Sequence, residues 1–124
     1  MGYRSDIAIM LYAHKAEDAS VLKVWFEQFQ EGIREHLYDN RIAYNERGIL
    51  FHAECTKWYD QYIDVQFIEN ILRQFIDVFQ TQDTQRAYNY EYIRIGEDMD
   101  DVEEKSGYGG FRWMSTERSI KLNF

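Results

Sequence analysis

Apolar residues along the chain either alternate with other residues or recur at every third or fourth position, and these two periods predict strands and helices respectively. Residues 5–13 alternate, with Ile7, Ile9 and Leu11 on one face of the predicted strand. The opposite face is also apolar, since it carries Met10 and its neighbours. A strand with two apolar faces is expected near the centre of a sheet.

Two segments have the helical period. Residues 18–38 carry a predicted buried stripe at steps of three and four, which consists of Leu22, Phe26, Phe29, Ile33 and Leu37. Residues 63–80 carry a second stripe of the same kind, which consists of Ile68, Ile71, Leu72, Phe75 and Phe79. Asp60 or Asp64 is expected to cap the second helix at its N-terminus.

Five further strands are predicted, of which the one at residues 49–58 is the longest. They are expected at residues 41–45, 49–58, 87–95, 111–115 and 119–122. Glu46, Arg47 and Gly48 are expected to form a hairpin turn, in which Gly48 supplies the positive φ that such turns need. The polar residues 81–86 and the glycine-rich residues 106–110 are expected to be loops.

The order of these elements predicts one α+β domain over residues 1–124. Its layout is β-α-β-β-α-β, as in ferredoxin-like folds, with one or two extra strands at the end. We expect a mostly antiparallel sheet with both helices on one face. The other face is then open to water or to a partner.

Negative charge is concentrated in one short segment. The net charge is −8, and six carboxylates within eight residues account for most of it: Glu97, Asp98, Asp100, Asp101, Glu103 and Glu104. Such a patch repels phosphate backbones, so we expect a basic protein partner and no nucleic acid. The alternatives are a solvated connection, a mimic of nucleic-acid phosphates, and a weak divalent-ion site. The spacing of a calcium loop is missing.

Aromatic residues make up 17% of the chain, which is more than a core of this size usually takes. If the alternation of residues 49–58 places Phe51 toward the helices, His52 and Trp58 face the open side. Two or more of Tyr88, Tyr90 and Tyr92 are candidates to join them. We therefore add Trp58, Tyr90 and Tyr92 to the carboxylates as candidate partner-binding residues. The alternative is that the terminal strands or a longer loop cover this face.

No catalytic motif is complete. His52, Ala53 and Glu54 match the start of the zinc deaminase signature, but the chain has one cysteine and no proline to complete it. His14, His36 and His52 come from separate elements, and Cys55 is expected to be a small buried residue. The glycines at 107–110 lack the Lys-Ser/Thr ending of a phosphate loop. We expect no catalytic residues, metal site or cofactor.

The compartment is inferred from absent signals. A single cysteine excludes an internal disulfide and suits a reducing environment. No apolar run reaches the length of a signal peptide or a membrane span. We therefore expect a cytoplasmic protein without a membrane partner.

Both ends of the chain resemble a known group of proteins. The sequence MGYRSD at residues 1–6 leads into the first strand, YIRIGED at residues 92–98 leads into the acidic run, and a short strand follows near the end. Together these resemble small tailed-phage and prophage accessory proteins. The group has no assigned activity, so the resemblance transfers no functional residue. It implies a bacterial host cytoplasm and a protein that modifies host or defence machinery by binding it.

The sequence thus favours a non-enzymatic binding protein that docks on a host or phage protein. The acidic segment, the aromatic sheet face, or both are the expected docking surfaces. One alternative is a self-associating structural protein that forms a homodimer through the open sheet face. Another is a metal-dependent enzyme that uses His52, Glu54 and a carboxylate of the acidic run.

Overall fold

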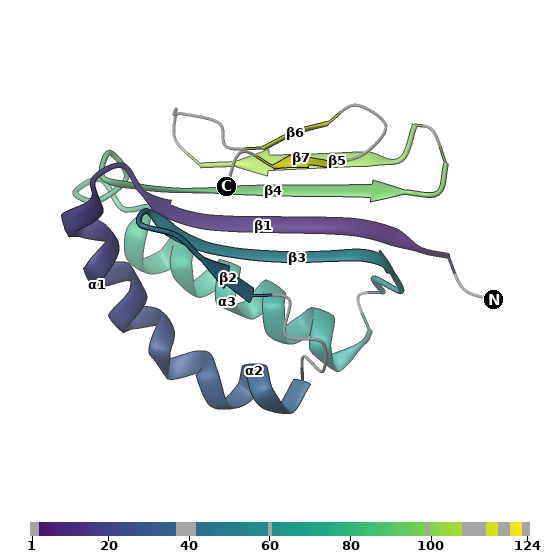
Figure 1. Cartoon of the computed structure of the whole chain (residues 1–124), viewed down its shortest axis with the longest axis horizontal. Helices are drawn as coiled ribbons and strands as arrows, with labels where there is room; N and C mark the ends of the chain where they lie inside the picture. The colour runs from purple at the N-terminus through teal and green to yellow at the C-terminus, as the bar shows by residue number, and fades with distance from the viewer. Residues whose placement is uncertain are drawn as a thin grey trace.

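A computed structural model describes residues 3–36, 42–59, 61–98, 100–107, 114–116 and 120–122 of the chain. Its elements follow in the order β1 (Ser5–Ala13), α1 (Ala16–Phe26), a 3-10 turn (Glu27–Phe29), α2 (Gln30–His36), β2 (Ile42–Tyr44), β3 (Gly48–Thr56), α3 (Ile63–Phe79), β4 (Tyr88–Gly96), β5 (Val102–Ser106), β6 (Met114–Thr116) and β7 (Ile120–Leu122). Figure 1 shows the helices below one sheet and the last two strands above it. The α+β class is therefore confirmed.

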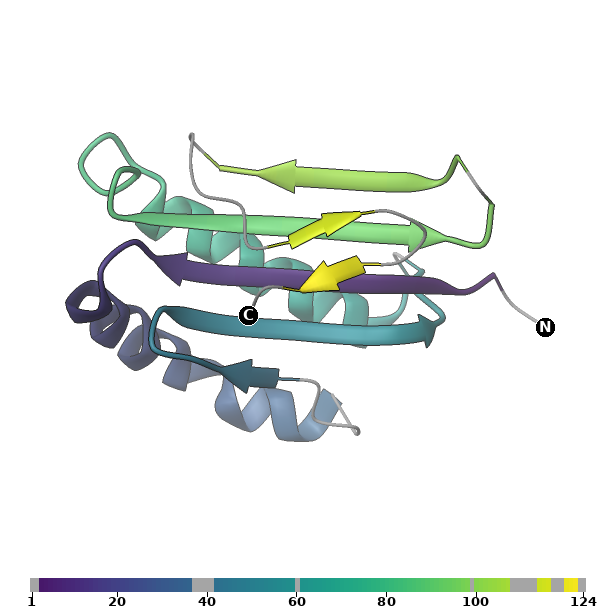
Figure 2. The same cartoon turned by 45° about the horizontal axis from the view of Figure 1, so that its top comes forward.

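The main sheet has five antiparallel strands in the order β2-β3-β1-β4-β5 (Figure 2). The central position of β1 confirms the expectation from its two apolar faces. Ile9 pairs with Phe51 of β3 on one side and with Tyr92 of β4 on the other, so the three side chains lie on one face. Strand β5 was not expected, because four of its five residues, Val-Glu-Glu-Lys-Ser, are polar.

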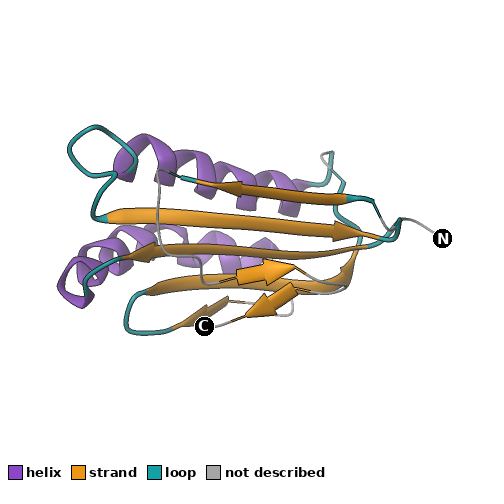
Figure 3. Cartoon of the chain, turned by 90° about the horizontal axis from the view of Figure 1, so that it is seen from above, coloured by secondary structure: helices purple, strands orange, loops and turns teal. Residues whose placement is uncertain are grey.

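Both helical segments cover the same face of the sheet (Figure 3). Their expected stripes are buried where the structure describes them, and Leu37 lies outside the described residues. Trp25 packs edge-on against Phe79 at 5.2 Å between ring centroids, which joins the first helix to α3. The expected cap of α3 was wrong, because Tyr62 occupies the N-cap and Asp64 lies in the first turn. Asp60 lies outside the described residues.

The face of the sheet opposite the helices is not open. Strands β6 and β7 form a separate two-stranded sheet that lies over this face (Figures 2 and 3). Ile120 of β7 packs against a small apolar cluster formed by Ala8, Met10, Tyr12, Leu50 and Ile93. Every member of that cluster is 5% exposed or less. The two terminal strands therefore exist as expected, but they lie over the main sheet instead of extending it.

Glycine is required at position 48 for a different reason from the one expected. It is the first residue of β3 and pairs with Tyr12, without a positive φ. A Cβ atom there would lie 2.1 Å from the carbonyl oxygen of Leu11, so only glycine lets the two strands approach. The turn is instead stabilised by Asn45, whose Oδ1 accepts hydrogen bonds from the amides of Arg47 and Gly48 at 2.8 Å each.

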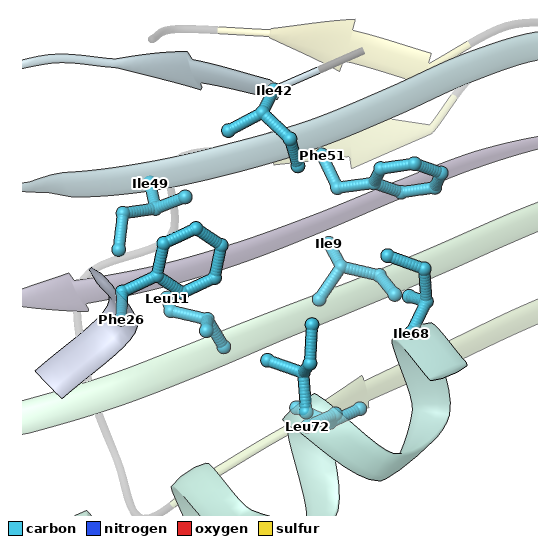
Figure 4. Close-up of a pocket in the computed structure, with 9 residues that line it drawn as sticks. Ile9, Leu11, Phe26, Ile42, Ile49, Phe51, Ile68 and Leu72 are labelled. Atoms are coloured by element: carbon cyan, nitrogen blue, oxygen red, sulfur yellow. The ribbon is translucent and has the colours of Figure 1, made fainter. Parts of the chain in front are cut away.

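The core between the helices and the sheet contains one small apolar cavity of about 20 Å³ (Figure 4). Its lining consists of Ile9, Leu11, Phe26, Ile42, Ile49, Phe51, Ile68, Ile71 and Leu72. A cavity of this volume holds about one water molecule, but the lining offers that water no polar partner. It is therefore a packing void and not a ligand site.

The helices are too short or too polar to cross a membrane. Among the described residues, no helix combines the length and the apolar character that such a crossing requires.

Candidate functional site

A polar cleft of about 580 Å³ opens on the helix-covered side of the sheet, near the start of the chain. Strands β1, β4 and β5, the connection between β3 and α3, and helix α3 all contribute to it. Its lining consists of Tyr3, Ser5, Trp58, Tyr59, Gln61, Glu69, Tyr92, Arg94, Glu103 and Lys105. The volume is in the range of small-ligand sites, and the lining combines aromatic rings with charges of both signs.

Arg94 forms ion pairs with two carboxylates at the cleft, those of Asp101 and Glu103. Its Nη2 donates to Asp101 Oδ1 at 2.7 Å, and its Nη1 donates to Asp101 Oδ2 at 3.1 Å. The Arg94 Nε lies 3.5 Å from Oε1 of Glu103, its cross-strand neighbour on β5. The Arg94 guanidinium lowers the pKa of Asp101 to about 2, with help from a hydrogen bond donated by Tyr3. The pKa of Arg94 is raised in turn, chiefly by Asp101.

Tyr3 links the start of the chain to the acidic segment. Its hydroxyl donates to Asp101 Oδ2 at 2.5 Å and accepts a hydrogen bond from the amide of Asp98 at 3.1 Å. The amide of Tyr3 donates to the hydroxyl of Tyr59, and the amide of Arg4 donates to Glu97 Oε1 at 2.8 Å. The bond to Asp101 raises the pKa of Tyr3. The turn between β4 and β5 is thus held against the first residues described.

Lys105 lines the cleft from β5. Its ammonium is 4.8 Å from the ring centroid of Tyr92, its cross-strand partner, and 3.8 Å from Glu103 Oε2. The side chain of Lys105 is 54% exposed, whereas Tyr92 is 2% exposed. Burial raises the pKa of Tyr92, and the negative charge of Glu103 raises it further.

The predicted acidic residues separate into two groups. Asp101 and Glu103 are partly buried and pair with Arg94 inside the molecule. Glu97, Asp98, Asp100 and Glu104 are exposed at the β4–β5 hairpin and on β5. The acidic run therefore forms a hairpin with the end of β4 over its described residues. Its backbone closes through the amide of Gly96 and the carbonyl of Asp101 at 2.7 Å.

The expected aromatic face was wrong. Tyr88 and Tyr92 are buried in the core on the helix side, and Tyr90 packs against that core. The register explains this, because Tyr92 and Tyr90 pair with Ile9 and Leu11, which face the helices. Trp58 lies two residues beyond the end of β3, so the alternation of that strand no longer determines which side the Trp58 side chain faces.

Trp58 turns toward the helix side. Its ring centroid lies 6.0 Å from that of Phe51. Among the described residues no hydrogen bond of ordinary geometry satisfies its buried indole nitrogen, which nevertheless lies near the Tyr92 hydroxyl and opposes the larger rise that burial causes in the pKa of Tyr92. Trp58, Tyr92 and Glu103 therefore meet at the cleft, and Tyr90 does not line it.

The other candidates stay apart from the cleft. His52 and Glu54 are neighbours on one face of β3, with 3.7 Å between Nε2 and Oε1, as the alternation predicted. His14 packs its ring edge-on against Tyr12 at 5.6 Å. The side chains of His36 and Cys55 lie outside the described residues. Among the side chains that are described, no three of His, Cys, Asp and Glu gather as metal ligands would.

Sequence reasoning missed Tyr3, Tyr59, Arg94 and Lys105 as members of this site. A signal for Arg94 was present: β4 alternates, so Arg94 shares a face with Tyr92. Lys105 required knowledge that the acidic run returns as a strand. Tyr3 and Tyr59 lie outside regular elements, where periodicity carries no information.

No protein-family model matches the chain, and no curated protein or solved structure is significantly similar to it. The resemblance to tailed-phage accessory proteins stays a prediction. Any function assigned to this chain therefore rests on the geometry of its described residues.

Proposed function

We propose that this protein is a non-enzymatic binding protein that recognises a basic partner protein through the β4–β5 hairpin and the adjoining cleft. The observation that carries the proposal is the placement of three exposed carboxylates, Glu97, Asp98 and Asp100, at the end of a hairpin whose interior is held by ion pairs. Tyr3 contacts this turn and also lines the cleft, so the two features form one continuous surface.

Electrostatics supports a basic partner. Exposed carboxylates in one short segment create a negative potential that attracts positive surfaces and accelerates their association. Arg94 compensates Asp101 and approaches Glu103. The outer carboxylates are therefore presented on a hairpin that these ion pairs brace over its described residues, which lowers the ordering cost of binding.

The cellular setting is part of the same proposal. A host or phage protein in a bacterial cytoplasm is the partner that the resemblance implies. The homodimer alternative was expected to use the open, aromatic sheet face, and β6–β7 lies over that face. The described structure contains no observation that favours the enzyme alternative over a binding protein.

We further infer that the first four strands follow the ferredoxin-like layout. The order β2-β3-β1-β4 and the antiparallel pairing of every neighbour support this. In this interpretation β5 is an addition at the edge, and it brings the acidic hairpin beside the cleft.

The test is affinity capture from bacterial lysate treated with nuclease, with the triple variant Glu97→Gln, Asp98→Asn, Asp100→Asn as the comparison. A matched control, Glu27→Gln, Glu31→Gln, Glu35→Gln, removes the same charge from exposed positions on the first helical segment. We expect a salt-sensitive partner that the hairpin variant loses and the control retains. Equal retention by both variants would show that the hairpin does not bind the partner.

A further inference from the structure

The contact between Lys105 and Tyr92 shows what the cleft can hold. An ammonium group lies over the ring of Tyr92 at 4.8 Å from its centroid, with the Glu103 carboxylate 3.8 Å away. Ring faces carry negative electrostatic potential, so a ring next to a carboxylate is a favourable environment for a cation. One cation of the chain itself already uses this environment.

The rest of the lining is suited to the same kind of group. Trp58 and Tyr59 add two further rings from the connection between β3 and α3, and Glu69 adds a carboxylate from α3. Arg94 is the second cation in the cleft, but the positive charge of Arg94 is compensated by its bidentate ion pair with Asp101. Glu69, Asp101 and Glu103 outnumber Arg94 and Lys105 in and beside the cleft, so the departure of Lys105 would make the cleft more negative.

We propose that the cleft is a recognition site for the alkylammonium group of a lysine on the basic partner, and that Lys105 occupies this site until the partner displaces it. This inference rests on the proposed function, because it names the chemical group that the partner inserts. Lys105 acts as a competitor within the same chain. When no partner is bound, its ammonium offsets the charge of Glu103.

The contacts of Lys105 are weak enough to exchange. Its side chain is 54% exposed, and its distance of 3.8 Å from Glu103 is longer than a good charge-assisted hydrogen bond. Exposed ion pairs and cation–π contacts of this kind contribute little to stability. A lysine that arrives on a partner already attracted by the hairpin carboxylates therefore competes effectively, since its effective concentration at the cleft is high.

The experiment uses an acetylated and amidated tetralysine peptide as the probe. Its binding to the full chain is followed by NMR through the indole N–H signal of Trp58 and the backbone amide of Tyr59. Lys105→Met removes the competing ammonium and keeps the aliphatic stem. Lys23→Met, on α1, produces the same change in net charge away from the cleft. A peptide of four acetyl-lysines tests whether the charge is required.

We expect Lys105→Met to bind tetralysine about threefold more tightly than Lys23→Met, which is the factor that one exposed cation–π contact provides. We expect the acetylated peptide to leave the Trp58 and Tyr59 signals unchanged. Equal affinity in the two variants, or shifts that avoid Trp58 and Tyr59, would overturn the inference. Lys105→Gln gives the same comparison if the Met variant does not fold.

The two proposals fail in different ways. If Lys105→Met has no effect on tetralysine binding but the hairpin variant loses the captured partner, the lysine site is wrong and the binding function stands. If the hairpin variant retains every partner while Lys105→Met strengthens tetralysine binding, the cleft accepts an ammonium and the hairpin function is wrong.

Discussion

Arg94 and Asp101 form a bidentate ion pair across the β4–β5 hairpin, with nitrogen–oxygen distances of 2.7 and 3.1 Å. This pair joins a residue of β4 to the last residue before β5 and is reinforced by the hydroxyl of Tyr3. A planar guanidinium that meets both oxygens of a carboxylate fixes direction as well as distance. It therefore fixes the residue that begins the β5 side of the hairpin against β4.

The first prediction concerns acid stability. The folded protein holds the pKa of Asp101 at about 2, below the value of about 3.9 expected in an unfolded chain. The stabilisation that this lowered pKa provides is complete at pH values above the pKa of the unfolded chain. It is lost as the pH falls through the pKa of the folded protein. Asp101→Asn should therefore flatten the decline of unfolding free energy between about pH 4 and pH 2. Urea unfolding at a series of pH values measures this, and an unchanged slope would contradict it.

The second prediction separates Tyr3 from Arg94. Tyr3→Phe removes a hydrogen bond to Asp101 and leaves the ion pair intact, so the pKa of Asp101 should rise only part of the way toward its ordinary value. An NMR titration of the Asp101 carboxyl carbon measures the change. Tyr62→Phe, at an exposed position beside α3, is the control and should leave this pKa unaltered.

The third prediction concerns alkaline stability. Burial and Glu103 raise the pKa of Tyr92, so its neutral hydroxyl is favoured in the folded state. That contribution is present below the unfolded pKa of about 10 and is lost as the pH rises through the folded value. Tyr92→Phe should therefore weaken the loss of unfolding free energy above about pH 10. Chemical unfolding at alkaline pH tests this, and a loss as steep as that of the parent would count against it.

The fourth prediction concerns the aromatic core. Phe75 is fully buried and contacts Trp25, Phe79 and Tyr90. Phe75→Ala removes these contacts and leaves a cavity, so the unfolding free energy should fall by about 3–5 kcal/mol. Val78→Ala lies on the exposed side of the same helix and should change it by less than about 0.5 kcal/mol. Urea denaturation compares the two variants, and similar costs would show that Phe75 is not central to the core.

The fifth prediction compares two glycines. A Cβ at Gly48 meets the backbone of Leu11, which cannot move without distorting the sheet, so Gly48→Ala should cost about 1–3 kcal/mol. A Cβ at Gly32 meets the ring of Phe67 at 2.5 Å, and that ring can move aside. Alanine also gains about 1 kcal/mol over glycine in a helix, so Gly32→Ala should cost less. Thermal unfolding ranks the variants, and the reverse order would contradict this explanation.

Local periodicity in the sequence predicted much of the architecture. The alternation of residues 5–13 and the helical stripe of residues 63–80 matched β1 and α3 closely, because burial of one face imposes a period on a strand or helix. Apolar periodicity cannot reveal an edge strand that consists mostly of charged residues. Val102–Ser106 forms β5 because it pairs with β4 and sets Glu103 opposite Arg94, and no local preference predicts that.

The sequence by itself determined the α+β class, the central strand and the location of the acidic run. Only the tertiary structure decided which carboxylates are exposed, that Trp58 and Tyr92 lie on the helix side, and that the last strands lie over the opposite face. The physical reason is that helix and strand periods arise within single elements. The cleft arises where Tyr3, Arg94 and Lys105 meet, and the register between distant strands sets their positions.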